Sequence, residues 1–193
     1  LLMIGYLGYI NIFKAKELNS NAYNTKQDAN MDKYIRGSIL SSDGNVLAKT
    51  TVTDAGEEIR EYPYANVFSH VIGYASNGKS GLEASANHDL LSSHASVLTQ
   101  IQDEAQAEKT MGDSVVVTLN SQLQNAAYQA LGSYNGAIVA MEPDTGKILA
   151  MVSKPDFDPN AIEEIWESVV TDSSSSVLLN RATQGLYPPG STF

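Results

Sequence analysis

Few side chains in the sequence combine a type and a spacing that suggest chemistry. The sequence contains no cysteine, which excludes disulfide bonds, a thiolate nucleophile and cysteine-based zinc sites. The histidines His70, His88 and His94 show no HExxH or comparable metal-ligand spacing. His88 and His94 lie in a polar stretch, and we interpret them as solvated loop residues. We therefore predict no metal site.

One serine near the C-terminus lies in a distinctive local sequence. Ser191 follows Pro188-Pro189-Gly190, a pattern typical of the start of a helix. An ordinary helix cap would explain this serine equally well. A catalytic role would require an adjacent base, because a serine hydroxyl is a weak nucleophile at neutral pH.

The composition indicates a folded, acidic protein. Hydrophobic residues make up 42% of the 193 residues and charged residues 18%, so the chain can form a packed core. The formal net charge is −10, and the excess of acidic residues lies after residue 50. Such a surface repels the phosphate backbone of nucleic acids, so we expect no nucleic-acid partner. The length allows one large domain or two small ones.

The first residues, Leu1–Phe13, are almost wholly apolar. They are too few to cross a bilayer, which needs about 20 residues. They fit either a buried strand or core helix, or the outer end of a membrane-spanning helix that begins earlier. Tyr6 and Tyr9 suit the interfacial aromatic belt, and Lys14 and Lys16 suit the exit to water. We favour the membrane anchor over a cleaved signal peptide, because no small-x-small cleavage site follows.

The next part of the chain begins with a linker and a hairpin. Residues 14–33 are polar and rich in asparagine, which indicates a linker. Residues 34–48 predict a β-hairpin whose turn contains Asp43-Gly44, because glycine permits the positive φ that such turns need.

Three segments after the hairpin are less regular. Residues 54–61 are charged, and we interpret them as a loop. Residues 62–74 mix aromatic and β-branched side chains around a proline and a glycine, which suggests short irregular strands. Residues 80–112 are polar, and the sequence leaves helix and strand equally open there.

The pattern becomes clearer after residue 112. Val115–Leu119 predicts a strand, and Asn120 is a helix cap. The helix that follows carries one apolar face, formed by Leu123, Ala127, Ala130 and Leu131. Two further strands, Ala137–Met141 and Lys147–Val152, flank an EPDTG turn and are apolar on both faces. We expect this pair inside a sheet that is covered on both sides, although few residues remain to cover the second face.

A second helix is predicted over Asn160–Val170. Its tryptophan, Trp166, is interpreted as a packing anchor rather than as a platform for a ligand.

Four segments, in this order, resemble motifs of the class B penicillin-binding proteins. They are Arg36–Ala48 (RGSILSSDGNVLA, similar to RGxI…DxxGxxLA), Gly81-Leu-Glu83, Gly136–Asn160 (GAIVAMEPDTGKILAMVSKPDFDPN), and Asn180-Arg-Ala followed by Tyr187–Phe193 (YPPGSTF, similar to YxPGSTFK). Each motif alone is weak, because a tripeptide or a turn can occur in any fold. Their common order makes the resemblance specific. It is strongest to the single-spanning enzymes of Gram-positive bacteria that support septation.

The resemblance implies an α+β fold in two pieces behind an anchor. Residues 1–13 would end the transmembrane helix, and residues 14–112 would form a mostly-β pedestal of the dimerisation type. Residues 113–193 would supply the first helix and hairpin of a serine β-lactamase-like transpeptidase domain. The implied location is the cytoplasmic membrane, single-pass, with the domains on the extracellular side.

The implied activity is peptidoglycan D,D-transpeptidation, without metal or organic cofactor. In this family a serine attacks the D-Ala-D-Ala end of a stem peptide, and β-lactams imitate that dipeptide. The resemblance makes Ser191 the nucleophile and the residue three positions later, a lysine in the family, its base. Stem peptides, β-lactam antibiotics and other cell-wall and division proteins are the implied partners.

The other motif residues are expected to be structural: Arg36, Gly37, Gly81, Glu83, Asn180, Arg181 and Gly190. Asn180 and Arg181 would hold the loop before the serine. Glu83 fits either an exposed charge or a pedestal ion pair with Arg36. The sequence leaves both possibilities open.

Two alternatives have a different function. The chain could be a non-catalytic scaffold that docks other wall-synthesis proteins through the pedestal. A β-lactam-hydrolysing or β-lactam-sensing relative would share the serine motif, but such relatives lack the RGxI and GLE pedestal. We read the sequence as a fragment at both ends, which stops before the lysine position. As written, we expect it to be inactive.

Overall fold

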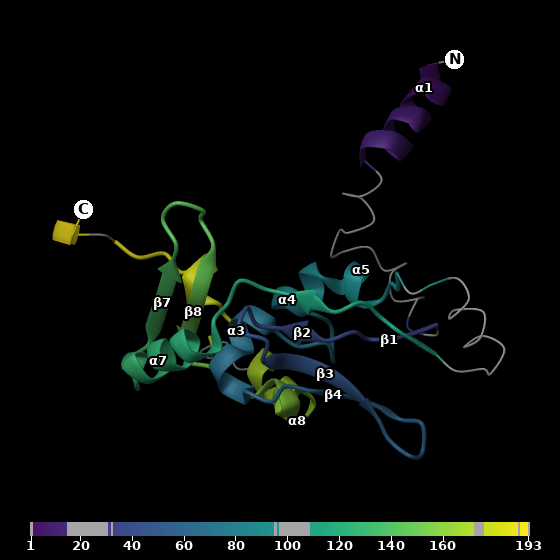
Figure 1. Cartoon of the computed structure of the whole chain (residues 1–193). Coiled ribbons are helices and arrows are strands. Elements are labelled where there is room, and N and C mark those ends of the chain that lie inside the picture. The colour runs from purple at the N-terminus through teal and green to yellow at the C-terminus, as the bar shows by residue number, and fades with distance from the viewer. Residues whose placement is uncertain are drawn as a thin grey trace.

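A computed structural model describes residues 2–14, 31, 33–94, 96, 109–171, 176–188 and 190–192 (Figure 1). Helices and strands are mixed, as expected for an α+β protein. The strands are β1 Tyr34–Ile35, β2 Ile39–Leu40, β3 Val46–Val52, β4 Glu58–Glu61, β5 Thr110–Met111, β6 Val115–Val116, β7 Gly136–Met141 and β8 Ile148–Lys154. The α-helices are α1 Leu2–Tyr9, α3 Ser69–Ile72, α4 Gly81–Ser85, α5 Asn87–Leu90, α7 Ser121–Leu131, α8 Ile162–Thr171 and α9 Arg181–Gln184. A π-helical turn, η1 Ile10–Lys14, follows α1, and the 3₁₀ helices are η3 Ala65–Phe68, η4 Pro159–Ala161 and η5 Gly190–Thr192.

The first part of the fold is built on a sheet with strand order β4-β3-β2-β6. The predicted hairpin is confirmed, since β2 pairs antiparallel with β3 around Gly44, which has φ 80°. The prediction that residues 54–61 form a loop is wrong for their second half. There β4 pairs with β3 and aligns Thr50 with Arg60. A charged strand of this kind is stable because its partner supplies the hydrogen bonds and its charges can face solvent or other charges.

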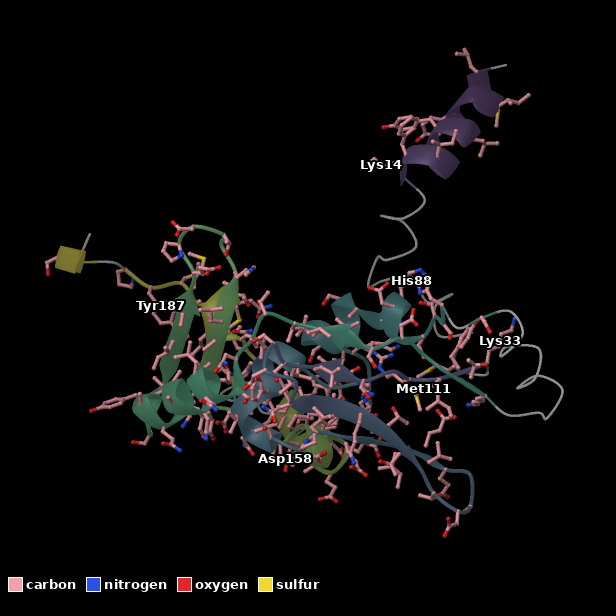
Figure 2. All side chains as sticks on the ribbon, in the orientation of Figure 1. Lys14, Lys33, His88, Met111, Asp158 and Tyr187 are labelled. Carbon is pink, nitrogen blue, oxygen red and sulfur yellow. The ribbon has the colours of Figure 1, made fainter. Side chains whose placement is uncertain are left out.

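The prediction of irregular strands over residues 62–74 is wrong, because residues 65–72 are helical. They form η3 and α3, and they bury Phe68 and Ile72 against Ile39 and Leu47 of the sheet. For residues 80–112 the sequence left helix and strand equally open. Residues 81–90 of this stretch form α4 and α5, whereas 97–108 lie outside the described residues. His88 is therefore a half-buried helix residue and not a solvated loop residue (Figure 2).

The helix α7 begins where the sequence predicts. Asn120 is its N-cap, and its side chain accepts a hydrogen bond from the Leu123 backbone N–H at 2.9 Å. The predicted buried face is partly wrong, because Leu123 is 38% exposed whereas Gln124 is fully buried. The Gln124 amide bonds three backbone groups at 2.8 Å each, the Val67 and Met151 carbonyls and the Met151 N–H, and so joins α7 to η3 and β8.

The hairpin β7–β8 is present, and Ile138 pairs with Val152. In the described part of the chain no other strand pairs with it. Helix α7 lies on one face, and the segment with α9 covers part of the other. Val139 and Met141 stay 47% and 56% exposed. The expectation of an incompletely covered face is met there.

Helix α7 and the strand before it also contact the first sheet. The Asp43 carboxylate of the β2–β3 turn accepts a hydrogen bond from the Ser121 hydroxyl at the start of α7. This bond is the main reason that the pKa of Asp43 lies well below its usual range. In addition, β6 pairs in parallel with β2, so the strand just before α7 belongs to the first sheet. The division of the chain at residue 112 stays a prediction.

The interpretation of Trp166 as a packing anchor agrees with its surroundings. Its ring meets that of Tyr74 edge-to-face at 5.7 Å, and it packs on a cluster that also contains Phe157 and Ile162.

The apolar N-terminal segment is helical and stands apart from the rest of the chain (Figure 1). It is not a buried strand or core helix, because none of its described side chains is buried, and Leu2 and Met3 are 93% and 79% exposed. Among the described residues, no helix is both long enough and apolar enough to span a membrane.

Candidate active site

Ser191 lies in the short turn η5 at the C-terminal end of the chain, where its side chain is exposed. Gly190 before it has φ 58°, a conformation that strongly favours glycine. The segment that carries Tyr187 leads away from β7 and β8 to this turn (Figure 2). Within the described residues, no hydrogen bond or ion pair reaches the Ser191 hydroxyl.

Asn180 and Arg181 fix the start of the segment that leads to Ser191. Asn180 caps α9 through its side-chain oxygen, which accepts from the Ala182 N–H at 3.0 Å, and its amide donates to the His70 carbonyl at 3.3 Å. The Arg181 guanidinium donates to the carbonyl and hydroxyl of Ser176. The Arg181 N–H donates to the Ser153 hydroxyl on β8 at 2.9 Å. The side chains of Asn180 and Arg181 therefore hold this segment against the rest of the protein, in agreement with the structural role expected for them.

His70 ties the same segment to the first part of the fold. Its side chain is 8% exposed, and Nε2–H donates to the Pro155 carbonyl at 2.9 Å. Its ring also meets Phe157 edge-to-face at 5.3 Å. Burial lowers the pKa of His70, which favours the neutral ring.

A cleft of about 420 Å³ lies beside β7 and α9. Val139 of β7, Arg181 of α9 and Tyr187 from the segment before Ser191 are among the residues that line it. No Asp, Glu, His or Lys is among the described residues that line this cleft.

The pedestal motifs meet in a buried ion cluster. Arg36 Nε lies 2.6 Å from Glu83 Oε2, and the two side chains are 6% and 0% exposed. Arg36 also donates to the Asn87 side chain at 2.6 Å. Arg60 of β4 donates to the other oxygen of Glu83 at 2.8 Å. Glu83 is therefore not an exposed charge, and the pairing with Arg36 is present.

Arg60 is the member of this cluster that the sequence analysis missed. It lies in the segment interpreted as a loop, and no sequence motif includes it. Arg60 pairs with Thr50 in the β3–β4 register, which places the two side chains on the same face of the sheet. Its Nη1 also donates to the Gly37 carbonyl at 2.7 Å. The only local indication that Arg60 belongs to a strand is the alternation of side chains in residues 58–61.

Gly37 and Gly81 are required by close backbone contacts. A Cβ on Gly37 would lie 2.0 Å from the Asp113 carbonyl oxygen, and one on Gly81 would lie 2.7 Å from that of Val71. Gly81 also has φ 55°. The Gly37 N–H donates to the Leu90 carbonyl, so the segment between β1 and β2 cannot simply move outward.

We expect Gly37→Ala to lower the free energy of unfolding by about 2–3 kcal/mol, because backbone must shift to admit the methyl group. Urea unfolding of the whole chain measures this loss. Gly136→Ala is the matched control, since its nearest heavy atom would be Leu131 Cδ1 at 4.0 Å. Equal stability of the two variants would show that the Gly37 contact is not tight.

The first part of the fold is a sheet with a buried Arg–Glu cluster. A helix and a hairpin follow it and lead to the turn that contains Ser191. This arrangement defines a pedestal joined to the first part of a serine transpeptidase-type domain. Residues 36–115 match the family model of the penicillin binding protein A dimerisation domain, and residues 136–193 match that of the penicillin binding protein transpeptidase domain. The chain belongs to the class B penicillin-binding proteins. The predicted family and fold class are confirmed.

Curated relatives carry matching names. The chain is 35% identical to the peptidoglycan D,D-transpeptidase PbpA of Mycolicibacterium smegmatis over 100% of its own length and 42% of the relative. It is also 35% identical to the peptidoglycan D,D-transpeptidase MrdA of Acinetobacter baumannii, over 69% of this chain and 24% of that protein. The chain thus spans less than half the length of these relatives.

Solved structures agree with the fold. The D,D-transpeptidase domain of a peptidoglycan glycosyltransferase from Eggerthella lenta aligns with TM-score 0.69 and 39% identity, over 82% of this chain and 34% of that one. The imipenem acyl-enzyme complex of penicillin-binding protein A from M. tuberculosis aligns with TM-score 0.73 and 32% identity, over 84% of this chain and 41% of that one.

Proposed function

We propose that this chain is part of a penicillin-binding peptidoglycan D,D-transpeptidase in which Ser191 is the acyl nucleophile. The observation that carries the proposal is the position of Ser191, exposed in a turn at the end of the segment that matches the transpeptidase domain. Similar proteins support it. Two relatives are named peptidoglycan D,D-transpeptidases, and penicillin-binding protein A of M. tuberculosis forms an acyl-enzyme with imipenem.

In the proposed reaction, the Ser191 oxygen forms an ester bond with the carbonyl carbon of the penultimate D-alanine. The amide bond to the terminal D-alanine breaks, and its nitrogen leaves with a proton. An amine of a second stem peptide then attacks the ester and releases the serine. A β-lactam would react through the first step alone, because its opened ring stays attached to the serine.

The other motif residues would support this chemistry through positioning. Asn180 and Arg181 anchor the segment that leads to Ser191, and Gly190 permits the backbone turn before it. Arg36, Gly37, Gly81 and Glu83 would keep the pedestal rigid. The base would be the family lysine three residues after the serine.

The N-terminal segment supports the proposed location. Helix α1 and the turn η1 expose apolar side chains that include Ile4, Leu7 and Phe13, and Lys14 follows directly. We propose that this segment inserts into the cytoplasmic membrane and holds the domains on its outer face. Cell-wall synthesis at the septum, together with other wall-synthesis and division proteins, is the process proposed for it.

The test is covalent modification by penicillin of a chain that extends through the whole transpeptidase domain. Peptide mapping by mass spectrometry should place the added mass on Ser191. Modification of a different serine would contradict the proposed nucleophile, and absence of modification in a folded, extended chain would contradict the proposed activity.

A further inference from the structure

The sequence contains two Asn-Gly dipeptides, Asn77-Gly78 and Asn135-Gly136, which the proposed transpeptidation does not use. In such a pair the backbone nitrogen of the glycine can attack the side-chain amide of the asparagine. Glycine favours this attack, because it has no side chain in the way and its backbone can adopt the required conformation. The two dipeptides are alike in this respect, so their positions in the fold decide which of them reacts.

Asn77-Gly78 lies at the exposed tip of the loop between α3 and α4. Asn77 has φ 54° and Gly78 has φ 105°. Asparagine tolerates a positive φ better than most residues, and glycine adopts it freely. Among the described residues, neither the Asn77 side chain nor the Gly78 N–H has a hydrogen-bond partner. A Cβ on Gly78 would have no heavy atom within 4 Å, so the space beside the reacting nitrogen is open.

The two ends of this loop are held together. The Ser80 N–H donates to the Tyr74 carbonyl at 3.1 Å, and the Tyr74 N–H donates to the Ser80 hydroxyl at 3.3 Å. A Cβ on Gly73 would lie 2.1 Å from the Ser80 carbonyl oxygen, so the two strands of the loop are in close contact. The ring of Tyr74 packs edge-to-face on those of Phe157 and Trp166. The tip can therefore change while the base of the loop stays closed.

Asn135-Gly136 has a different environment. Asn135 is also exposed, but Gly136 is the first residue of β7 and pairs with Lys154 of β8. The Gly136 nitrogen can reach the Asn135 side chain only when the backbone leaves its strand geometry. Such a local opening of a paired strand costs free energy, whereas an exposed loop tip opens at almost no cost.

We propose that Asn77 is a site of covalent modification, at which the chain converts its own asparagine to aspartate and isoaspartate without an enzyme. The Gly78 nitrogen forms a bond to the side-chain carbonyl carbon of Asn77 and loses its proton, and the amide nitrogen leaves as ammonia. Water then opens the five-membered imide at either of its two carbonyl groups. One opening gives aspartate. The other gives isoaspartate, in which the backbone runs through the side chain.

The modified loop differs from the parent loop in charge and in length. Both products add a negative charge at the tip, and isoaspartate also inserts a carbon atom into the backbone. Because Tyr74 and Ser80 fix the base of the loop, the change should stay within residues 75–79. The modified chain should therefore stay folded, with the ion pair between Arg36 and Glu83 intact.

The test incubates the whole chain in detergent micelles at mildly alkaline pH and follows both dipeptides by peptide mapping with mass spectrometry. Asn77 should be converted at least about tenfold faster than Asn135, because the loop tip needs little free energy to open. Two synthetic peptides, each with one dipeptide and its neighbours, give the rates without the fold. These rates should agree within about threefold, because glycine follows in both.

Two results would overturn the proposal. One is equal conversion of Asn77 and Asn135 in the folded chain. The other is conversion of Asn77 in the folded chain at less than about a tenth of its peptide rate, which would show that the loop protects it.

The variant Asn77→Gln keeps an uncharged amide but would have to close a six-membered ring, which forms more slowly. Ion-exchange chromatography of the incubated variant should show the loss of most of the acidic form that the parent chain produces. Asn135→Gln is the matched control and should produce this acidic form at the parent rate. Formation of the acidic form at the parent rate in Asn77→Gln, or its loss in Asn135→Gln, would show that Asn77 is not the site.

Discussion

Ser191→Ala is expected to lower the rate of covalent labelling by a fluorescent penicillin at least about a thousandfold, in a chain extended through the transpeptidase domain. The reason is that the serine oxygen forms the bond to the antibiotic in the proposed reaction, and the alanine side chain has no nucleophilic atom to replace it. Labelling is measured by in-gel fluorescence over a time course. Circular dichroism should show that the variant is folded.

Ser168→Ala is a suitable control for this experiment. Ser168 is exposed on α8, and its hydroxyl donates to the Ile165 carbonyl of the same helix. This variant should be labelled at the parent rate. Labelling of Ser191→Ala at a comparable rate would show that another residue is the nucleophile.

Glu83→Gln is expected to lower the free energy of unfolding by about 3–5 kcal/mol. The substitution keeps the size of the side chain but leaves Arg36 and Arg60 buried without a negative partner. An amide also presents an N–H₂ group to a guanidinium that can only donate. Urea unfolding of the whole chain measures the change, with the slope of the transition as a check on two-state behaviour.

Glu61→Gln is the matched control for Glu83→Gln. Glu61 also pairs with a basic residue, Lys49, at 3.0 Å, but the two side chains are 41% and 45% exposed. Water screens such a pair, so the loss should be much smaller than for Glu83→Gln. A similar small loss for Glu83→Gln would mean that the buried cluster contributes little to pedestal stability.

The sequence alone was sufficient for features set by local chemistry. The Asp43-Gly44 turn, the Asn120 cap and the β7–β8 hairpin each depend on a few neighbouring residues, and all are present. The family also followed from short motifs in a fixed order. The apolar N-terminal segment was found by composition, although only the structure showed that its side chains are exposed.

Tertiary structure decided the features that depend on distant partners. Residues 62–74 have strand-like composition, but residues 65–72 are helical because Phe68 and Ile72 pack against the sheet in that form. Gln124 is polar, yet it is fully buried because backbone groups of η3 and β8 satisfy its amide. Arg60 enters the Glu83 cluster only through the pairing of β4 with β3. Sequence patterns report local preference, whereas burial of a polar side chain depends on partners that only the folded chain brings within hydrogen-bond distance.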